Sequence, residues 1–154
     1  MEAPAQITPS KLGDYLEILT KPVFESGLNW QVVNSKWPAF QELFHGFDPE
    51  VVASLPPDEL DKISEDTRII RSRKKIDATV HNAQAMIEIE KEFGSFKAYA
   101  SAQGGYEPLV KDMRKRFKYL GEFGAYYFLY VVGEDVPKEH EYRAKLLEGA
   151  QKPR

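Results

Sequence analysis

The chain has 154 residues, of which 42% are hydrophobic and 29% are charged. This composition excludes disordered and fibrous proteins and predicts one globular domain over residues 1–154. The absence of cysteine excludes disulfides, thiolate metal sites and a cysteine nucleophile. A formal net charge of −3, taken as an average, argues against a partner as anionic as nucleic acid.

Two features of the sequence bear on its location. The amino-terminal residues lack a basic head followed by an apolar run, so no secretory signal is expected. The longest apolar run, near 125–132, is far shorter than the ~20 residues that span a bilayer. We therefore expect a cytoplasmic protein without membrane contact, and we take it as a monomer.

The first third of the chain predicts short helices. Ser10 is typical of a helix start, and this helix is expected to kink or break at Pro22, because proline lacks an amide donor and clashes one turn back. Asn29 predicts the start of a second short helix, and Pro38 the start of a third. Asp48 before a proline and a glutamate predicts another helix over 51–55.

Longer helical patterns follow. A proline pair with acidic residues leads into a helix at 60–64. The longest candidate runs from about residue 70 to Phe93, where Gly94 is suited to end it, and Ser95 predicts the start of the next. Beyond a glycine-containing loop we expect a basic helix at 108–117, an almost wholly apolar helix at 120–132 and a charged helix at 137–147. The predicted fold class is all-α, a compact bundle of about nine short helices with 120–132 buried in the middle.

The positive charge is concentrated in two windows. Residues 68–75 hold five basic side chains and no acidic one, and residues 111–118 hold five basic side chains opposed only by Asp112. Together the windows carry +9, which leaves −12 for the rest of the chain. A single window of this kind is more typical of a solvated helix face, but two such windows favour a positive face for a polyanion.

The first window coincides with a pair of predicted helices. Residues 60–64, a tight turn at 65–68 and a helix from 69 onward predict a helix-hairpin-helix element. A helix start offers unpaired amides and a positive dipole end, which together with arginine and lysine suit a phosphate. This geometry holds a nucleic-acid backbone without reading its sequence, and a plain helical hairpin is the equal alternative.

Several segments, in the same order, resemble the DNA-3-methyladenine glycosylase I family: 26–30, 44–49, 69–76, 82–85 and 115–121, followed by Tyr126 and Phe128. The likeness runs from about residue 16 to 133. It implies an all-α helix-hairpin-helix glycosylase that flips a damaged base out of double-stranded DNA and hydrolyses its glycosidic bond. No lysine stands in a motif for Schiff-base chemistry, so a monofunctional enzyme without a cofactor is implied.

The resemblance also implies a base pocket. Trp30 falls on the family's stacking tryptophan, although from the residues alone it reads better as core packing. Tyr126 or Tyr127 would line the pocket. The family's base-contacting glutamate falls on Pro22, which has no side-chain acceptor, and we expect Glu25, about one turn along the helix, as its substitute.

The family's two-Cys, two-His zinc site cannot form without cysteine, and we expect no structural metal. The resemblance assigns the basic windows to the DNA face, and the residues expected to bind the backbone are Arg68, Arg71, Arg73, Lys74, Lys75, Lys115, Arg116 and Lys118. Arg68 and Lys74 stand where the family has glycines.

Three functions are compatible with these observations. The first is a DNA glycosylase that excises alkylated purines such as 3-methyladenine. The second is a relative that binds DNA or a modified nucleotide without cleaving it, which the loss of the glutamate at Pro22 favours. The third is a helical interaction module that has kept only the fold.

Overall fold

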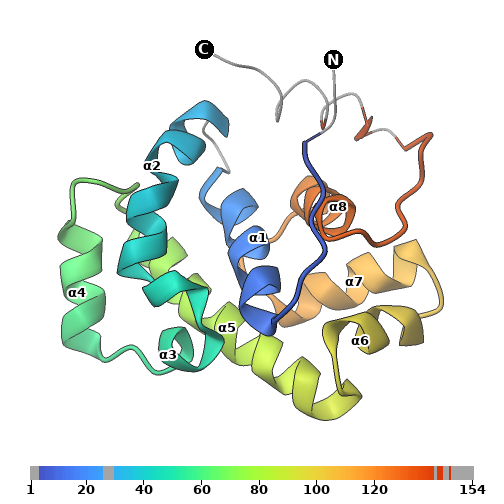
Figure 1. Cartoon of the computed structure of the whole chain (residues 1–154), viewed down its shortest axis with the longest axis horizontal. Coiled ribbons are helices and arrows are strands. Elements are labelled where there is room, and N and C mark those ends of the chain that lie inside the picture. Colours follow the sequence, from blue (N-terminus) through green and yellow to red (C-terminus); the bar gives the residue numbers. More distant parts are fainter. Residues whose placement is uncertain (1–3, 26–29, 141, 144–145, 147–154) are drawn as a thin grey trace.

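The computed structural model describes residues 4–25, 30–140, 142–143 and 146, and in these ranges the chain is helical without strands. The described residues form eight α-helices and one short 3-10 helix (Figure 1): α1 Leu12–Glu25, α2 Trp30–Leu43, η1 His45–Phe47, α3 Pro49–Ala53, α4 Pro57–Glu65, α5 Arg73–Phe93, α6 Phe96–Ala102, α7 Tyr106–Arg116 and α8 Glu122–Val131. The all-α prediction is confirmed.

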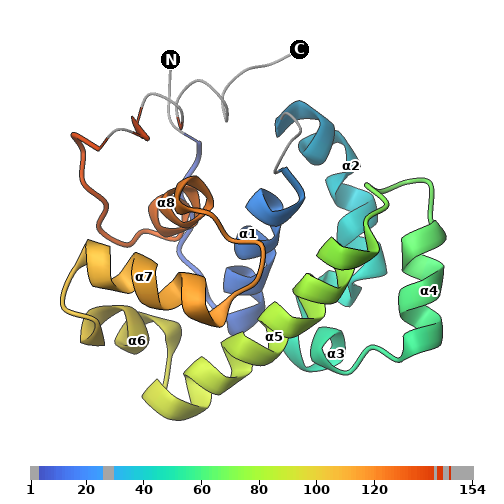
Figure 2. The same cartoon turned by 180° about the vertical axis from the view of Figure 1, so that it is seen from behind.

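Helix α1 lies in the middle of the molecule. Helices α2 to α4 lie on one side of it, α6 to α8 lie on the other, and α5 crosses past both groups (Figures 1 and 2). Helix α1 contacts α2, α3, α5 and α8. Its side chains Leu16, Leu19 and Val23 are fully buried, because their spacing places them on one helical face.

Three predicted helix boundaries are confirmed, whereas the predicted cap at Ser10 is wrong: α1 begins at Leu12, and the Ser10 hydroxyl donates to the Asp14 carboxylate at 3.1 Å instead of accepting from the first turn. Asp48 begins α3 by accepting a hydrogen bond from the Glu50 amide at 3.0 Å. Ser95 begins α6 in the same way, and Gly94 ends α5 in a left-handed conformation with φ 92°. Helix α5 begins later than predicted, because Ser72 caps it and accepts from the Lys75 amide. The turn between α4 and α5 is consequently longer than the predicted 65–68.

The two predicted helix breaks are wrong. Helix α1 continues through Pro22 to Glu25, and α2 continues through Pro38, so the second and third predicted helices are one. Pro22 is buried against α8, close to Gly124. Near Pro38, the rings of Trp37 and Phe40 stack 4.8 Å apart. This packing offsets the hydrogen bond that each proline removes.

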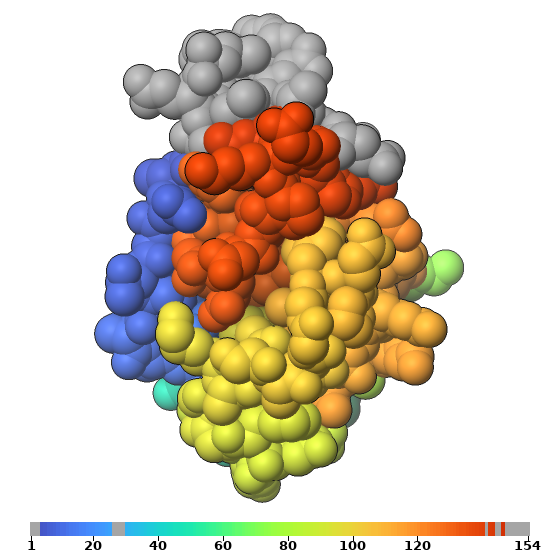
Figure 3. Space-filling model, turned by 90° about the vertical axis from the view of Figure 1, so that its right-hand side faces the viewer, coloured from blue at the N-terminus to red at the C-terminus, as the bar shows by residue number. Residues whose placement is uncertain are grey.

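Helix α8 is buried almost throughout, as predicted. The chain that follows it lies beside α7 (Figure 3). Residues 137–140 are not helical, which corrects the start of the predicted terminal helix, and most of its remaining residues lie outside the described part of the chain. The Pro137 carbonyl instead accepts a hydrogen bond from the Tyr126 hydroxyl at 2.8 Å. None of the described helices is long and apolar enough to cross a membrane.

Candidate functional site

An aromatic cluster joins α2 to α8. Trp30, the first residue of α2, lies 4.4 Å from Tyr127 between ring centroids, with 31° between the ring planes, and 6.5 Å from Phe123. Only 4% of Trp30 is exposed, because α8 covers it. Two residues that the sequence placed in a base pocket therefore meet, and they meet by packing against each other.

Glu25, the last residue of α1, interacts electrostatically with this cluster. Burial raises the pKa of the Tyr127 hydroxyl, and the negative charge of Glu25 raises it further. Burial lowers the pKa of Lys75, and the same charge opposes that shift. Glu25 ends α1 and Lys75 lies in the first turn of α5, so three helices bring an acid, a base and two rings together. The family-like segment that connects Glu25 to Trp30, residues 26–29, lies outside the described residues.

Pro22 has no polar side-chain atom, and its ring packs between α1 and α8. A Cβ added to Gly124 would lie 3.1 Å from the Pro22 Cβ, so the proline ring fills the space between α1 and α8. The position at which the resemblance expects a base-contacting glutamate is therefore used for helix packing.

Tyr126 lies apart from Trp30 and Tyr127. Consecutive residues of a helix point about 100° apart, and the fully buried Tyr126 faces the chain that follows α8. Its ring lies 4.9 Å from His140 and 6.0 Å from Tyr106. Tyr127 is thus the tyrosine that accompanies Trp30.

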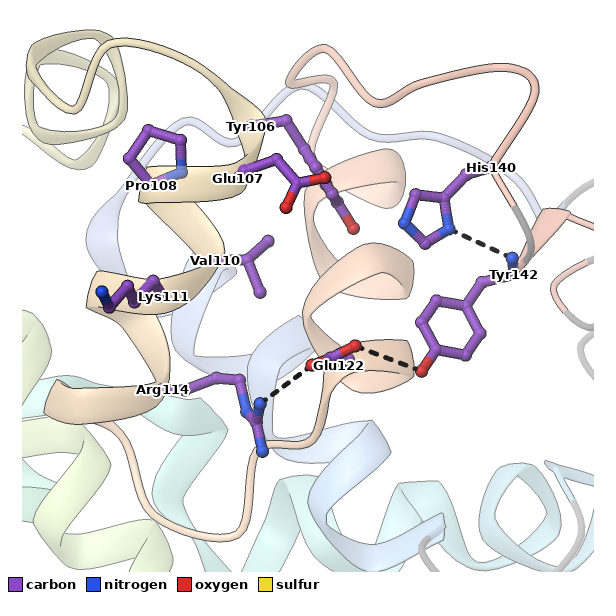
Figure 4. A pocket seen from close by; sticks show the side chains of 9 residues that line it. All are labelled: Tyr106, Glu107, Pro108, Val110, Lys111, Arg114, Glu122, His140 and Tyr142. Carbon is purple, nitrogen blue, oxygen red and sulfur yellow. Dashed lines mark hydrogen bonds and ion pairs between the residues drawn. The ribbon is translucent and has the colours of Figure 1, made fainter.

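An open hollow of about 510 Å³ lies on the Tyr126 side of the molecule, between α7 and the residues after α8 (Figure 4). Glu122 joins its walls, because it accepts hydrogen bonds from Arg114 at 3.2 Å and from the Tyr142 hydroxyl at 3.4 Å. The hollow includes neither Trp30 nor Glu25. Its lining is Tyr106, Glu107, Pro108, Val110, Lys111, Arg114, Glu122, His140 and Tyr142.

Three of the arginines expected to bind DNA are neutralised within the fold. Arg68 pairs with Glu42 at 3.1 Å and Asp66 at 3.0 Å, and Arg73 pairs with two aspartates, at 61 and 77. Arg116 donates to Asp112 at 2.7 Å. A paired guanidinium attracts a phosphate less, because its carboxylate partner must be displaced or left in place as a repelling charge.

The remaining basic residues form a smaller set. Among the described residues, no carboxylate pairs with Arg71, Lys74, Lys115 or Lys118, and these four are exposed. Lys75 belongs to the Glu25 cluster. Of the eight residues expected to bind the DNA backbone, these four are therefore the ones whose charge is not already opposed by an ion pair, and their contact with DNA stays a prediction.

Both basic windows adjoin α5: the first runs into the start of this helix, and the end of the second is bound by a residue in its middle. Asn82, in the middle of α5, accepts from the Lys118 amide at 2.8 Å and donates to the Lys118 carbonyl at 3.2 Å. Lys75 and Asn82 are seven residues apart, or roughly 10 Å along a helix. In Figure 2 the α4–α5 turn leads into one end of α5, and the α7–α8 loop lies beside α5. In the sequence Asn82 stands out only as part of a family-like segment. Its role in holding the loop at Lys118 could have been inferred from its position, because it is a polar residue within an apolar helical stripe.

The donor set does not fit the family's zinc site, because the chain has no cysteine. Among the described residues, no three histidine, aspartate or glutamate side chains come together in a group that could hold a metal ion. That the protein binds no structural metal stays a prediction.

Comparisons with known proteins agree on one family. A family model described as methyladenine glycosylase matches residues 13–119. The chain is 32% identical over 89 residues to the DNA-3-methyladenine glycosylase of Haemophilus influenzae, covering 58% of this chain and 48% of that protein. It is 28% identical over 130 residues to DNA-3-methyladenine glycosylase 1 of Escherichia coli, covering 71% and 70%. The match to the first relative thus spans about half of that protein's length.

Solved structures give the same result. The 3-methyladenine DNA glycosylase I from Staphylococcus aureus, described for its recognition of 3-methyladenine, superposes with a TM-score of 0.74 at 27% identity, covering 84% of this chain and 80% of that chain. A single-residue variant of a 3-methyladenine DNA glycosylase I in complex with 3-methyladenine superposes with a TM-score of 0.74 at 26% identity, covering 89% and 88%.

Proposed function

Because the chain belongs to the methyladenine glycosylase family, we propose that it is a DNA base-excision repair enzyme that hydrolyses the N-glycosidic bond of 3-methyladenine or a similar alkylated purine. The observation that carries this proposal is the Trp30–Tyr127 pair with the Glu25 carboxylate nearby. Aromatic faces and a negative charge are the groups that select a positively charged purine.

The chemistry asks little of the protein. An alkylated purine carries a positive charge, and when the glycosidic bond breaks its electron pair neutralises that charge, so no proton has to be delivered to the leaving base. Water adds to the sugar carbon and loses a proton. Glu25 supplies a negative charge that attracts the purine cation and stabilises positive charge developing on the sugar.

The Trp30 ring is not preformed as an open platform. Since only 4% of the residue is exposed and Tyr127 packs against it, a base can contact the indole only after the Trp30 and Tyr127 rings separate. We propose that base flipping supplies the free energy for this rearrangement through the contacts that the base then makes.

Release of 3-methyladenine from methylated duplex DNA, measured by chromatography, tests the function. We expect release by the unchanged chain and a rate at least about ten-fold lower for E25Q, since a charge contact of this kind is worth over ~1.4 kcal/mol. The matched control is E17Q on the same helix, where Glu17 accepts hydrogen bonds from Trp37 and Gln41 at 2.8 Å. Equal rates for the unchanged chain and E25Q would remove Glu25 from the mechanism.

The packing of Pro22 against Gly124 favours a second candidate, a relative that binds DNA or a modified nucleotide without cleaving it. This candidate predicts salt-dependent duplex binding with no release of base. A chain that neither releases base nor binds DNA would leave only the helical interaction module.

A further inference from the structure

Tyr119 is an unusual residue of the α7–α8 loop. It is 49% exposed, although it is a large aromatic side chain. Its φ is 58°, in the left-handed region that side chains with a Cβ rarely adopt. Both features are unfavourable for the folded protein by itself.

The surrounding hydrogen bonds hold the loop in this conformation. The Lys118 amide and carbonyl are both bound by Asn82, which is 1% exposed. On one side of Tyr119 the Arg116 carbonyl contacts His81 at 2.9 Å, and on the other the Leu120 carbonyl accepts from Arg114 at 3.3 Å. The ring is therefore presented to solvent from a fixed backbone.

Cations surround the ring. Tyr119 lines an open hollow together with Lys111 and Lys115, and Lys118 precedes it in the chain. Among the described residues these three lysines form no direct ion pair, although Lys115 lies near enough to Asp112 for their charges to interact, whereas the neighbouring Arg114 and Arg116 are paired. An apolar ring thus stands inside the part of the surface that is best suited to phosphates.

We infer that Tyr119 packs against a deoxyribose of the DNA strand whose phosphates Lys115 and Lys118 contact. The inference rests on the proposed function for its DNA partner. In an intact duplex the bases are stacked, and the groups that lie between successive phosphates are sugars, which proteins contact together with the phosphates. The half-exposed ring suits such an edgewise contact better than full-face stacking on a base.

The two kinds of contact respond differently to salt. A lysine that neutralises a phosphate releases counterions, so its contribution falls as salt rises. Packing of a ring against a sugar buries apolar surface and does not depend on salt in this way. Affinity and salt slope therefore separate Tyr119 from its neighbours.

The experiment measures binding of the full chain to an unmodified DNA duplex between about 50 and 200 mM salt. We expect Y119A to bind about five- to 30-fold more weakly at every salt concentration with an unchanged slope. Y119F should bind within twofold of the unchanged chain, and K115A should lose about one unit of slope. The matched control is I7A: Ile7 is a 37% exposed apolar residue outside both basic windows, and its amide binds the Val131 carbonyl.

Each other outcome overturns the inference in a recognisable way. If Y119A binds as tightly as the unchanged chain, the ring makes no contact, while the steep salt slope would still support DNA binding. If Y119F is as weak as Y119A, the hydroxyl binds a phosphate instead. A loss confined to duplexes with an unpaired base would indicate base stacking. Absence of DNA binding by the unchanged chain would reject the proposed function as well. Thermal melting checks folding, and Y119G replaces Y119A if the latter does not fold.

Discussion

Pro22 on α1 and Gly124 on α8 are in direct contact across the centre of the molecule. A Cβ on Gly124 would lie 3.1 Å from the Pro22 Cβ and 3.2 Å from the Leu120 Cδ1. The two helices come this close because α8 has no side chain at this position. The contact explains why proline is tolerated in α1: its ring packs into the space that Gly124 leaves on α8.

Replacement of Gly124 by alanine tests this packing. We expect G124A to lower the free energy of unfolding by about 1–3 kcal/mol, because the added methyl group overpacks the α1–α8 contact. Urea denaturation measures the change. The matched control is G121A, since a Cβ at Gly121 would meet nothing within 4 Å. Equal losses in the two variants would contradict the close approach.

The neighbours Lys115 and Arg116 are expected to differ in what they do. The Arg116 guanidinium binds Asp112 at 2.7 Å and lies 5.2 Å from the Tyr99 ring centre. We expect R116A to lower the free energy of unfolding by about 2 kcal/mol, and K115A to change it by less than about 0.5 kcal/mol.

For DNA binding, we expect K115A to have the larger effect and R116A the smaller one. K115A is expected to reduce the salt slope of duplex affinity by about one unit, and R116A to leave the slope unchanged because its charge is already neutralised. Urea denaturation and salt titration of the two variants side by side measure both effects. A loss of slope in R116A alone would return Arg116 to the DNA face and remove Lys115 from it.

The link between the two basic windows depends on Asn82. Its side chain is buried and makes both hydrogen bonds to Lys118. We expect N82A to cost about 2–3 kcal/mol, because it leaves two backbone groups unpaired, and to speed hydrogen exchange at the Lys118 amide. The control Q84A removes only an exposed hydrogen bond to the Ala53 carbonyl. An unchanged exchange rate at Lys118 would show that Asn82 does not hold the loop.

Alkaline pH should reveal the buried hydroxyl of Tyr127. Burial, with Glu25, raises the pKa of this group above its ordinary value of 10.0. Above pH 10 the unfolded chain releases this proton while the folded chain keeps it, so stability is full below pH 10 and falls as the pH rises, by up to about 1.4 kcal/mol per pH unit. Y127F removes this part of the loss.

Urea denaturation of the unchanged chain and Y127F between pH 7 and 11 measures the difference. At pH 7 to 9 the two should differ by a constant amount. Above pH 10 the unchanged chain should lose stability faster than Y127F. Parallel curves throughout would mean that the Tyr127 hydroxyl ionises equally in the folded and unfolded chains.

Several helix boundaries could be predicted from the sequence because their causes are local. The caps at Asp48 and Ser95 and the stop at Gly94 each act within about one turn of helix, and the structure confirms all three. The breaks predicted at Pro22 and Pro38 were wrong because a local cost was offset by packing against distant residues, which the local pattern does not contain.

The sequence by itself determined the helical class, the family-like segments and the presence of two basic windows. Only the tertiary structure decided which charges remain available, because Arg68 is paired across 26 residues and Arg73 across 12. It also decided that Tyr127, and not Tyr126, lies with Trp30. The physical reason is the same in each case: composition and spacing record which groups a chain carries, whereas pairing and burial depend on how distant helices pack.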